Sequence, residues 1–245
     1  MLTLKNINDF KNVTEGYNIS INNHQLNLFQ KYHAFLIEWN EKINLISRKQ
    51  NEGENDVILE RHFLDSIIFL TEIEHLSCEP RAESYESSFP VSQLPVPSSV
   101  LDIGSGGGFP AIPLAIMKPE WDFTLCESIS KKANFLGELI KYLGLTNVTI
   151  KNNRVEEMSS VRACHGKPQQ YDLITVRAVA KIDELIKYSL PLLKKGGSLL
   201  AFKGPAYEEE LKNAKGLIES KKLKVEVFSK EVNGIEKKLV VITPP

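Results

Sequence analysis

A glycine-rich run at residues 102–110 is the part of the sequence whose residue types and spacing point most clearly to chemistry. Its sequence is DIGSGGGFP, and it lies between an apolar run typical of a strand and a segment with a helical pattern. Glycines at such a place let the chain turn sharply and let a ligand approach bare backbone. We therefore predict that a ligand binds here, and that valine at Gly104 or Gly106 would fill its space.

The spacing of these glycines separates the known classes of ligand-binding loop. The dinucleotide pattern G-x-G-x-x-G would need a third glycine where Phe109 stands, and the phosphate-binding pattern G-x-x-x-x-G-K-[ST] does not occur. The run does match D-x-G-x-G-x-G, beginning at Asp102, which is the pattern of enzymes that use S-adenosylmethionine. A purely structural glycine turn and a nicotinamide site remain as alternatives.

Three polar positions follow the next strand candidates. Glu127 ends the second candidate, where a carboxylate can accept hydrogen bonds from both ribose hydroxyls of a nucleoside. A polar turn at 153–157 follows the third candidate, where we expect the adenine ring. Arg177 ends the fourth, where we expect the transferable methyl group. Taken alone, Glu127 could be an exposed strand-end carboxylate and the turn could be a solvated acidic loop.

Alternating strands and helices must hold these residues. Strand candidates are at 99–103, 122–127, 147–151, 171–176, 198–203, 224–230 and 238–242, and helix candidates between them are at 110–117, 129–143, 181–194 and 207–220. The alternation predicts a mainly parallel sheet with helices on both faces. Asn233-Gly234 favours a hairpin turn, so we expect an antiparallel strand near the end of the sheet. This predicts an α/β, Rossmann-like class I methyltransferase fold with seven strands and a C-terminal antiparallel hairpin.

The chain divides into three predicted parts. Residues 1–76 form an N-terminal helical extension, with helical patterns from about 23 to 70 and again from about 55 to 73. Residues 77–98 form a polar linker rich in Ser, Pro and Glu, and residues 99–245 form the S-adenosylmethionine-binding domain. The net charge is −4 over 1–76, −2 over 77–99 and +5 over 100–245, which is compatible with either a phosphate-binding face or ordinary solvated surface.

Composition excludes several classes of protein. Apolar residues make up 42% of the 245 residues, an ordinary value for a globular chain. No apolar run approaches the length of a membrane span, and the first residues contain no apolar signal core. The three cysteines show no metal-ligand spacing, so we expect them to be reduced and unmetallated. The sequence therefore favours a cytoplasmic protein with no membrane partner.

The absence of two further patterns limits the target atom. No Asp/Asn-Pro-Pro-Tyr/Phe follows the fourth strand candidate, which argues against methylation of an exocyclic amino group. No Pro-Cys or Thr-Cys stands there, which argues against cytosine C5 chemistry. A target atom that is already nucleophilic fits best.

Five sequence motifs, in this order, resemble those of the RsmG (GidB) family of bacterial 16S ribosomal RNA methyltransferases. They are WNEKINL at 39–45, RHFLDS at 61–66, DIGSGGGFP at 102–110, Glu127-Ser128 followed by Lys131-Lys132, and RAVA at 177–180. The resemblance covers roughly residues 24–242 apart from the linker. It implies formation of N7-methylguanosine at position 527, in the 530 loop of 16S RNA, in the small subunit or its assembly intermediate. It also implies a cytoplasmic enzyme, which we expect to be a monomer.

The resemblance also implies roles for individual residues. It places cofactor contacts on Gly104, Phe109, Val155, Glu156 and Arg177, which join Asp102, Gly106 and Glu127 from the motif argument. The cofactor is S-adenosylmethionine, the product is S-adenosylhomocysteine, and no metal is implied. Guanine N7 carries a lone pair and no proton, so the site need only align the reacting atoms and exclude water.

The polar string at 61–66 is expected to complete the catalytic site. Arg61, His62 and Asp65 should lie at the mouth of the methyl-transfer pocket and face Arg177. There, the two arginines would hold phosphate or the guanine O6 edge, and His62 would contact the target base. Asp65 would orient one of these side chains. The alternative is a helix-surface ion pair between Arg61 and Asp65.

Two other classes of function stay open on sequence alone. One is an S-adenosylmethionine-dependent methyltransferase of a small molecule or a protein. The other is an RNA-binding relative without catalytic activity.

Overall fold

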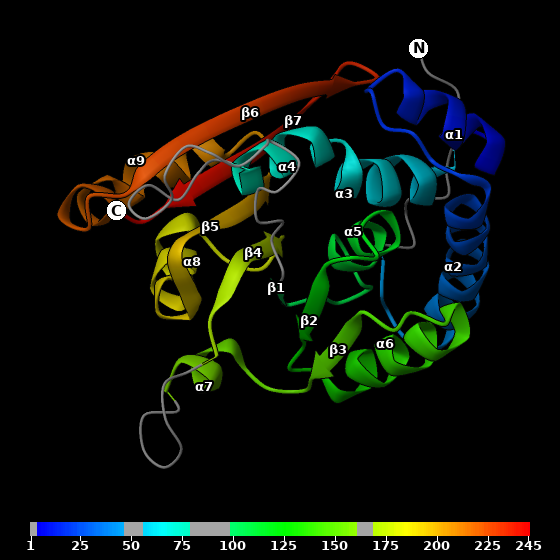
Figure 1. Cartoon of the computed structure of the whole chain (residues 1–245), viewed down its shortest axis with the longest axis horizontal. Coiled ribbons are helices and arrows are strands. Elements are labelled where there is room, and N and C mark those ends of the chain that lie inside the picture. Colours follow the sequence, from blue (N-terminus) through cyan, green and yellow to red (C-terminus); the bar gives the residue numbers. More distant parts are fainter. Residues whose placement is uncertain (1–3, 47–55, 79–98, 161–168) are drawn as a thin grey trace, which may run out of the picture.

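The computed structural model describes residues 4–46, 56–78, 99–160 and 169–245, and a seven-stranded sheet lies at its centre (Figure 1). The sheet order is β3-β2-β1-β4-β5-β7-β6, and β7 runs antiparallel to both of its neighbours, whereas β3, β2, β1, β4 and β5 are parallel. The strands are β1 (Ser99–Ile103), β2 (Asp122–Cys126), β3 (Val148–Lys151), β4 (Tyr171–Arg177), β5 (Leu193–Lys203), β6 (Lys224–Val232) and β7 (Ile235–Thr243). The predicted fold class is therefore confirmed.

The helices follow the expected alternation with several differences. They are α1 (Ile7–Glu15), α2 (Asn23–Lys42), the π-helix η2 (Leu59–Leu64), α3 (Asp65–Ile67), α4 (Leu70–Cys78), α5 (Ala111–Met117), α6 (Ser130–Leu143), α7 (Val155–Ser160), α8 (Ile182–Ser189), the 3₁₀ turn η4 (Leu190–Leu192) and α9 (Tyr207–Ser220). The helix expected over 181–194 ends at Ser189, because Pro191 lacks the N–H that an α-helix needs. The expected helical stretch 55–73 contains a π-helix. Two helices were not expected: α1, and α7, which begins inside the predicted polar turn at 153–157.

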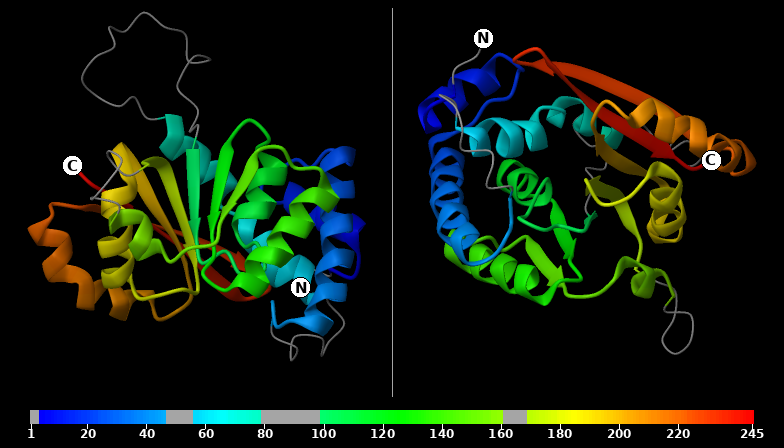
Figure 2. Two further views of the ribbon diagram at one scale, coloured as in Figure 1. Left: turned by 90° about the horizontal axis from the view of Figure 1, so that it is seen from below. Right: turned by 180° about the vertical axis from the view of Figure 1, so that it is seen from behind.

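Helices cover both faces of the sheet. Successive residues of β1 point to opposite faces, so that Val100 belongs to one apolar core and Leu101 to the other. α8 and α9 pack on the Leu101 face, and α5 and α6 on the Val100 face (Figure 2). The N-terminal helices lie over α5 and α6 and share their core, with α2 in contact with both. The linker predicted at 77–98 lies, from residue 79 on, outside the described residues.

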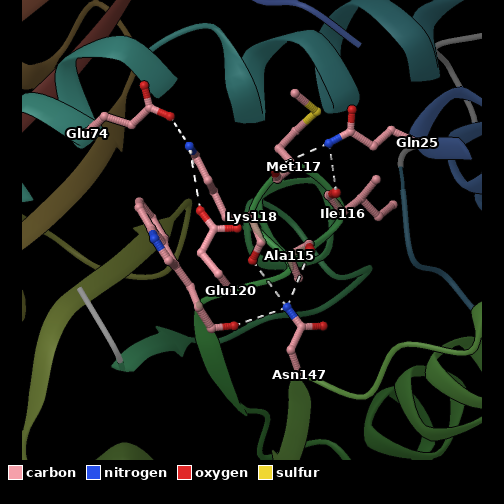
Figure 3. A network of polar contacts seen from close by, with 9 residues as sticks. Gln25, Glu74, Ala115, Ile116, Met117, Lys118, Glu120 and Asn147 are labelled. Carbon is pink, nitrogen blue, oxygen red and sulfur yellow. Dashed lines mark hydrogen bonds and ion pairs between the residues drawn. The ribbon is translucent and has the colours of Figure 1, made fainter. Parts of the chain in front are cut away.

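The end of α5 is held by amide side chains from two distant segments (Figure 3). The last carbonyls of a helix lack partners within the helix. Gln25 Nε2 donates to the carbonyls of Ile116 and Met117 at 3.3 and 3.4 Å, and Asn147 Nδ2 donates to three others, among them that of Ala115 at 3.3 Å. Gln25 also caps the start of α2, because its Oε1 accepts from the Asn22 N–H. One side chain thus joins the two helices.

The C-terminal hairpin has the turn that the sequence predicts. Asn233 and Gly234 have φ angles of 51° and 77°, the left-handed conformation that a two-residue turn between β6 and β7 requires. The hairpin is tied to the N-terminal helices, since Lys230 Nζ donates to the Ile68 carbonyl at 2.7 Å and to Glu72 at 2.9 Å. In the described part of the chain, every helix is too short or too polar to cross a membrane.

Candidate active site

The glycine loop lies at the carboxyl end of β1 and leads into α5. Gly104 and Gly106 have φ angles of 69° and 54°, so any side chain there would strain the backbone. A Cβ on Gly106 would meet only the Gly104 carbonyl, at 3.8 Å, which fits space left for a ligand. A Cβ on Gly104 would lie 2.6 Å from Val179 Cγ2. The prediction that valine at Gly104 would fill the space of the ligand is therefore wrong. At Gly104, the obstacle is a protein side chain.

Two carboxylates border this loop. Asp102 is fully buried, and its Oδ1 accepts from the Thr175 hydroxyl at 2.7 Å. Burial raises the pKa of Asp102 to about 7. Glu127 is 5% exposed, and its two oxygens accept from the backbone N–H groups of Gly106 and Ile129, both at 2.8 Å. The expected strand-end acid is therefore joined directly to the glycine loop.

The loop region can accommodate a cationic nucleoside ligand. Among the described residues, Asp102 Oδ2 has no hydrogen-bond partner although it is buried, and a buried polar oxygen without a partner is costly. The ammonium group of S-adenosylmethionine would supply such a partner. Each Glu127 oxygen keeps a second lone pair for a hydroxyl. The donor and acceptor set therefore fits this cofactor.

The polar turn after β3 lies beside Glu127. Asn152 Nδ2 donates to the Glu127 carbonyl at 2.7 Å, and Cys126 Sγ donates to that of Asn153 at 3.2 Å. Val155 begins α7 and is buried, whereas Glu156 is exposed. The structure thus brings the expected adenine-contacting turn next to the expected ribose-binding acid.

A column of stacked rings supports the glycine loop from the N-terminal side. Phe109 stacks between Tyr32 and His62, with ring centroids 5.5 and 4.7 Å away. His62 lies in the π-helix η2, where the Asp65 N–H donates to the Glu60 carbonyl five residues earlier. Such π-turns often occur at functional sites. Burial, with nearby positive charge, lowers the pKa of His62 to about 3, so its ring is neutral at physiological pH.

Arg177 and Asp65 lie close together as expected, but each makes its hydrogen bond to another residue. Arg177 Nη2 donates to the Arg61 carbonyl at 2.5 Å and lies 3.7 Å from Asp65 Oδ2. The same Asp65 oxygen accepts from Lys237 Nζ at 2.9 Å. The Arg61 side chain is exposed, so Arg61 contacts the cluster by its backbone. The alternative of a surface ion pair between Arg61 and Asp65 is therefore not what the structure shows.

A cavity of about 720 Å³ opens beside this cluster. Its lining comes from α3, from the loop after β4, from the end of β5 and from the C-terminal hairpin. It includes Asp65, Arg177, Val179, Phe202, Lys203 and Lys237. Val179 also lies against Gly104, so the cavity and the glycine loop share one side chain. The volume is in the range of small-molecule pockets.

Sequence reasoning missed two residues of this site. Tyr32 is fully buried, and its hydroxyl donates to the Gly107 carbonyl at 2.5 Å. Its only signal was an aromatic residue on the apolar side of a helix, which is also typical of an ordinary core position. Lys237 lies 172 residues from its partner Asp65, and no local pattern could have connected them.

Comparisons with known proteins agree with this geometry. Residues 85–240 match the family model described as rRNA small subunit methyltransferase G (GidB). A protein named ribosomal RNA small subunit methyltransferase G from Lactococcus lactis subsp. cremoris is 35% identical over 96% of this chain and 89% of its own length. A protein of the same name from Desulforamulus reducens is 36% identical over 85% and 76%.

Solved structures provide a comparison of fold alone. An O-methyltransferase from Bacillus cereus, determined in complex with S-adenosylhomocysteine, has a TM-score of 0.56 at 11% identity, covering 88% of this chain and 91% of its own. The O-methyltransferase TomG from Streptomyces achromogenes has a TM-score of 0.55 at 12% identity.

Proposed function

Because this chain belongs to the rRNA small subunit methyltransferase G family, we propose that it methylates N7 of a guanosine in 16S ribosomal RNA. S-adenosylmethionine is the methyl donor. The observation that supports this most is the meeting of two sites at one edge of the sheet. Val179 lies against Gly104 in the glycine loop, and the same loop binds Glu127 through the Gly106 N–H. Val179 also lines the cavity together with Asp65 and Arg177.

The cofactor would be held by residues at the ends of β1, β2 and β3, with Arg177 at the end of β4. The backbone at Gly104 and Gly106 gives the close approach, Asp102 Oδ2 offers an acceptor, and Glu127 offers lone pairs to the ribose. The turn at 153–157, with Val155 and Glu156, would border the adenine. Bound here, S-adenosylmethionine supplies an activated methyl group. The backbone of Phe109 remains in the proposed set, because its ring packs against Tyr32 and His62.

The chain's own residues then orient the target base. Guanine N7 needs no general base, so the neutral His62 ring has no proton to remove and serves as an uncharged packing surface. Arg177 holds the guanine O6 edge or a phosphate in the cavity, and Asp65 orients Arg177. The cavity lining contains both basic and acidic side chains, and two of its lysines pair with carboxylates, Lys203 with Glu210 and Lys237 with Asp65. No metal takes part in this proposal.

The physiological setting follows from the same proposal. The partner is 16S RNA in the small ribosomal subunit or in an assembly intermediate, and the place of action is the cytoplasm. The enzyme acts as a monomer without a membrane partner. Residues 1–76 are an extension that supports the glycine loop, and residues 99–245 carry the cofactor site.

Tritiated methyl transfer tests the proposal. Small subunits that lack the modification should accept label from the purified chain, and nuclease mapping should place it on one guanosine as N7-methylguanosine. Labelling of small molecules or proteins instead, or cofactor binding without transfer to any subunit, would support the two alternative functions.

Two variants test the residues of the acceptor site. We expect both variants to bind cofactor normally and to lose methyl transfer, His62→Ala because it removes the ring beside Phe109 and Arg61→Ala because it removes an exposed cation available to the RNA. Lys221→Ala, at the exposed end of α9, serves as a control. Wild-type turnover in both site variants would mean that the 61–66 segment is structural.

A further inference from the structure

The cavity beside β4 contains a charged pair, Asp65 and Arg177, and each of the two side chains has an atom without a hydrogen bond among the described residues. Asp65 Oδ2 accepts from Lys237 at 2.9 Å, and Arg177 Nη2 donates to the Arg61 carbonyl at 2.5 Å. Within the described residues, the other two atoms of the pair, Asp65 Oδ1 and Arg177 Nη1, have no hydrogen-bond partner, and both are buried. Buried polar atoms are nearly always paired, so these two call for an explanation.

The chemistry of the two unused atoms is complementary. A carboxylate oxygen only accepts hydrogen bonds, and a guanidinium nitrogen only donates them. Arg177 Nη2 lies 3.7 Å from Asp65 Oδ2, and both residues line the cavity, so one unused acceptor and one unused donor belong to neighbouring side chains there. Lys237 binds Asp65 Oδ2, and the Arg61 carbonyl binds Arg177 Nη2. These two hydrogen bonds limit the rotation of the Asp65 and Arg177 side chains.

This arrangement matches one edge of guanine and mismatches adenine. Guanine presents the acceptor O6 next to the donor N1–H, whereas adenine presents the donor N6–H next to the acceptor N1. Arginine commonly binds guanine through O6 and N7 together. Here N7 must stay free, because its lone pair forms the new bond. Recognition therefore has to use O6 with N1–H, and that edge needs an acceptor as well as a donor.

We propose that Asp65 and Arg177 are the base-recognition pair of this enzyme, with Arg177 Nη1 donating to guanine O6 and Asp65 Oδ1 accepting from N1–H. The inference rests on the proposed function. It adds a direct hydrogen bond between Asp65 and the base, whereas the sequence predicts only that Asp65 orients another side chain. N7 lies next to O6, on the side away from N1, so a guanine bound by the pair through O6 and N1–H keeps N7 free for the methyl donor. Val179 lines the cavity and also lies against Gly104, so this base would lie close to the glycine loop.

The first test uses the wild-type chain, so folding of a variant is not in question. Small subunits are reconstituted with guanosine, inosine, 2-aminopurine riboside or adenosine at the methylated position. Inosine keeps O6 and N1–H, and its kcat/KM should be within about threefold of that of guanosine. Adenosine and 2-aminopurine lack both groups and should be at least about 100-fold poorer. Competition binding of each subunit separates docking from transfer.

The second test changes the acceptor. An amide at position 65 can accept from guanine N1–H or donate to adenine N1, so Asp65→Asn should reduce the guanosine-to-adenosine ratio of kcat/KM at least about 10-fold without changing cofactor affinity. Glu72→Gln is the matched control, because Glu72 pairs with Lys230 at 2.9 Å on the same hairpin but does not line the cavity.

The outcomes separate the two claims. If the wild-type chain methylates no small subunit, the proposed function fails. If it methylates guanosine subunits but accepts 2-aminopurine equally, or if Asp65→Asn keeps the wild-type ratio, the function stands and the recognition pair is wrong.

Discussion

The hydroxyl of Tyr32 should control the glycine loop although Tyr32 lies 75 residues away. Tyr32→Phe removes one oxygen and keeps the ring that stacks on Phe109. Gly107 is buried, and among the described residues the Tyr32 hydroxyl is the donor to its carbonyl, so Tyr32→Phe leaves this acceptor unpaired there. Leaving a buried acceptor unpaired costs about 1–3 kcal/mol. For a chain of this size, that corresponds to a fall in Tm of about 2–4 °C for each kcal/mol.

The same substitution should also weaken cofactor binding. A loop that is no longer held by α2 must be ordered when the ligand binds, and a cost of 1.4 kcal/mol corresponds to about tenfold in Kd. We expect S-adenosylmethionine affinity, measured by calorimetry, to fall about 5- to 100-fold. Tyr17→Phe is the control, because its hydroxyl donates to the Glu231 carbonyl at 2.7 Å on the surface, where water can replace it.

Two results would refute this reasoning. An unchanged Tm in Tyr32→Phe would show that the hydrogen bond does not stabilise the fold. A lowered Tm with unchanged cofactor affinity would show that the bond stabilises the fold but leaves the loop's ligand-binding geometry unaffected.

The remaining predictions concern the loop, its acid and two titrating groups. Gly106→Val should abolish S-adenosylmethionine binding in calorimetry while the protein stays folded. The new side chain would occupy the space of the ligand, and the positive φ angle would strain the loop backbone. Glu127→Ala should weaken the same binding by about 1–3 kcal/mol, and a difference near zero would remove Glu127 from the site. The pKa of His62 is lowered to about 3, so the unfolded state gains a proton below pH 6.5 that the folded state does not. Urea unfolding should therefore show the stability advantage of wild type over His62→Gln shrinking from pH 8 to pH 5, and a widening gap would contradict this. Burial tends to raise the pKa of Asp56, but hydrogen bonds from His33 and two backbone N–H groups hold it below its usual value. Asp56→Asn should therefore cost about 1 kcal/mol at pH 7, and this difference should vanish as the pH falls through the lowered pKa and the carboxylate is protonated.

The sheet and the cofactor loop could be predicted because their signals are local. A strand is marked by its own apolar run, the loop by glycines within a few residues, and the hairpin by Asn233-Gly234. The π-helix could not be predicted, because the expected helix at 55–73 rests on the regular period of an α-helix. That period placed the Arg61 side chain beside Asp65, whereas the structure exposes it.

The contacts across the site could not be predicted for a different reason. Lys237 reaches Asp65 and Tyr32 reaches Gly107 only after the whole sheet has formed, and no pattern in either segment records the other. The unused hydrogen-bonding atoms of Asp65 and Arg177 are likewise properties of three-dimensional neighbours.

The tie between α2 and the glycine loop has a consequence for the chain during its own synthesis. Ribosomes add about 5–20 residues per second, so the 75 residues between Tyr32 and Gly107 take about 4–15 s to make. Through that interval, the apolar side of α2, with Phe29 and Tyr32, has neither α5 nor the loop to cover it. Gln25 must wait longer still for the end of α5, 91 residues on. The N-terminal helices are thus the first part of the chain to be made, yet they wait for α5 before this core is complete.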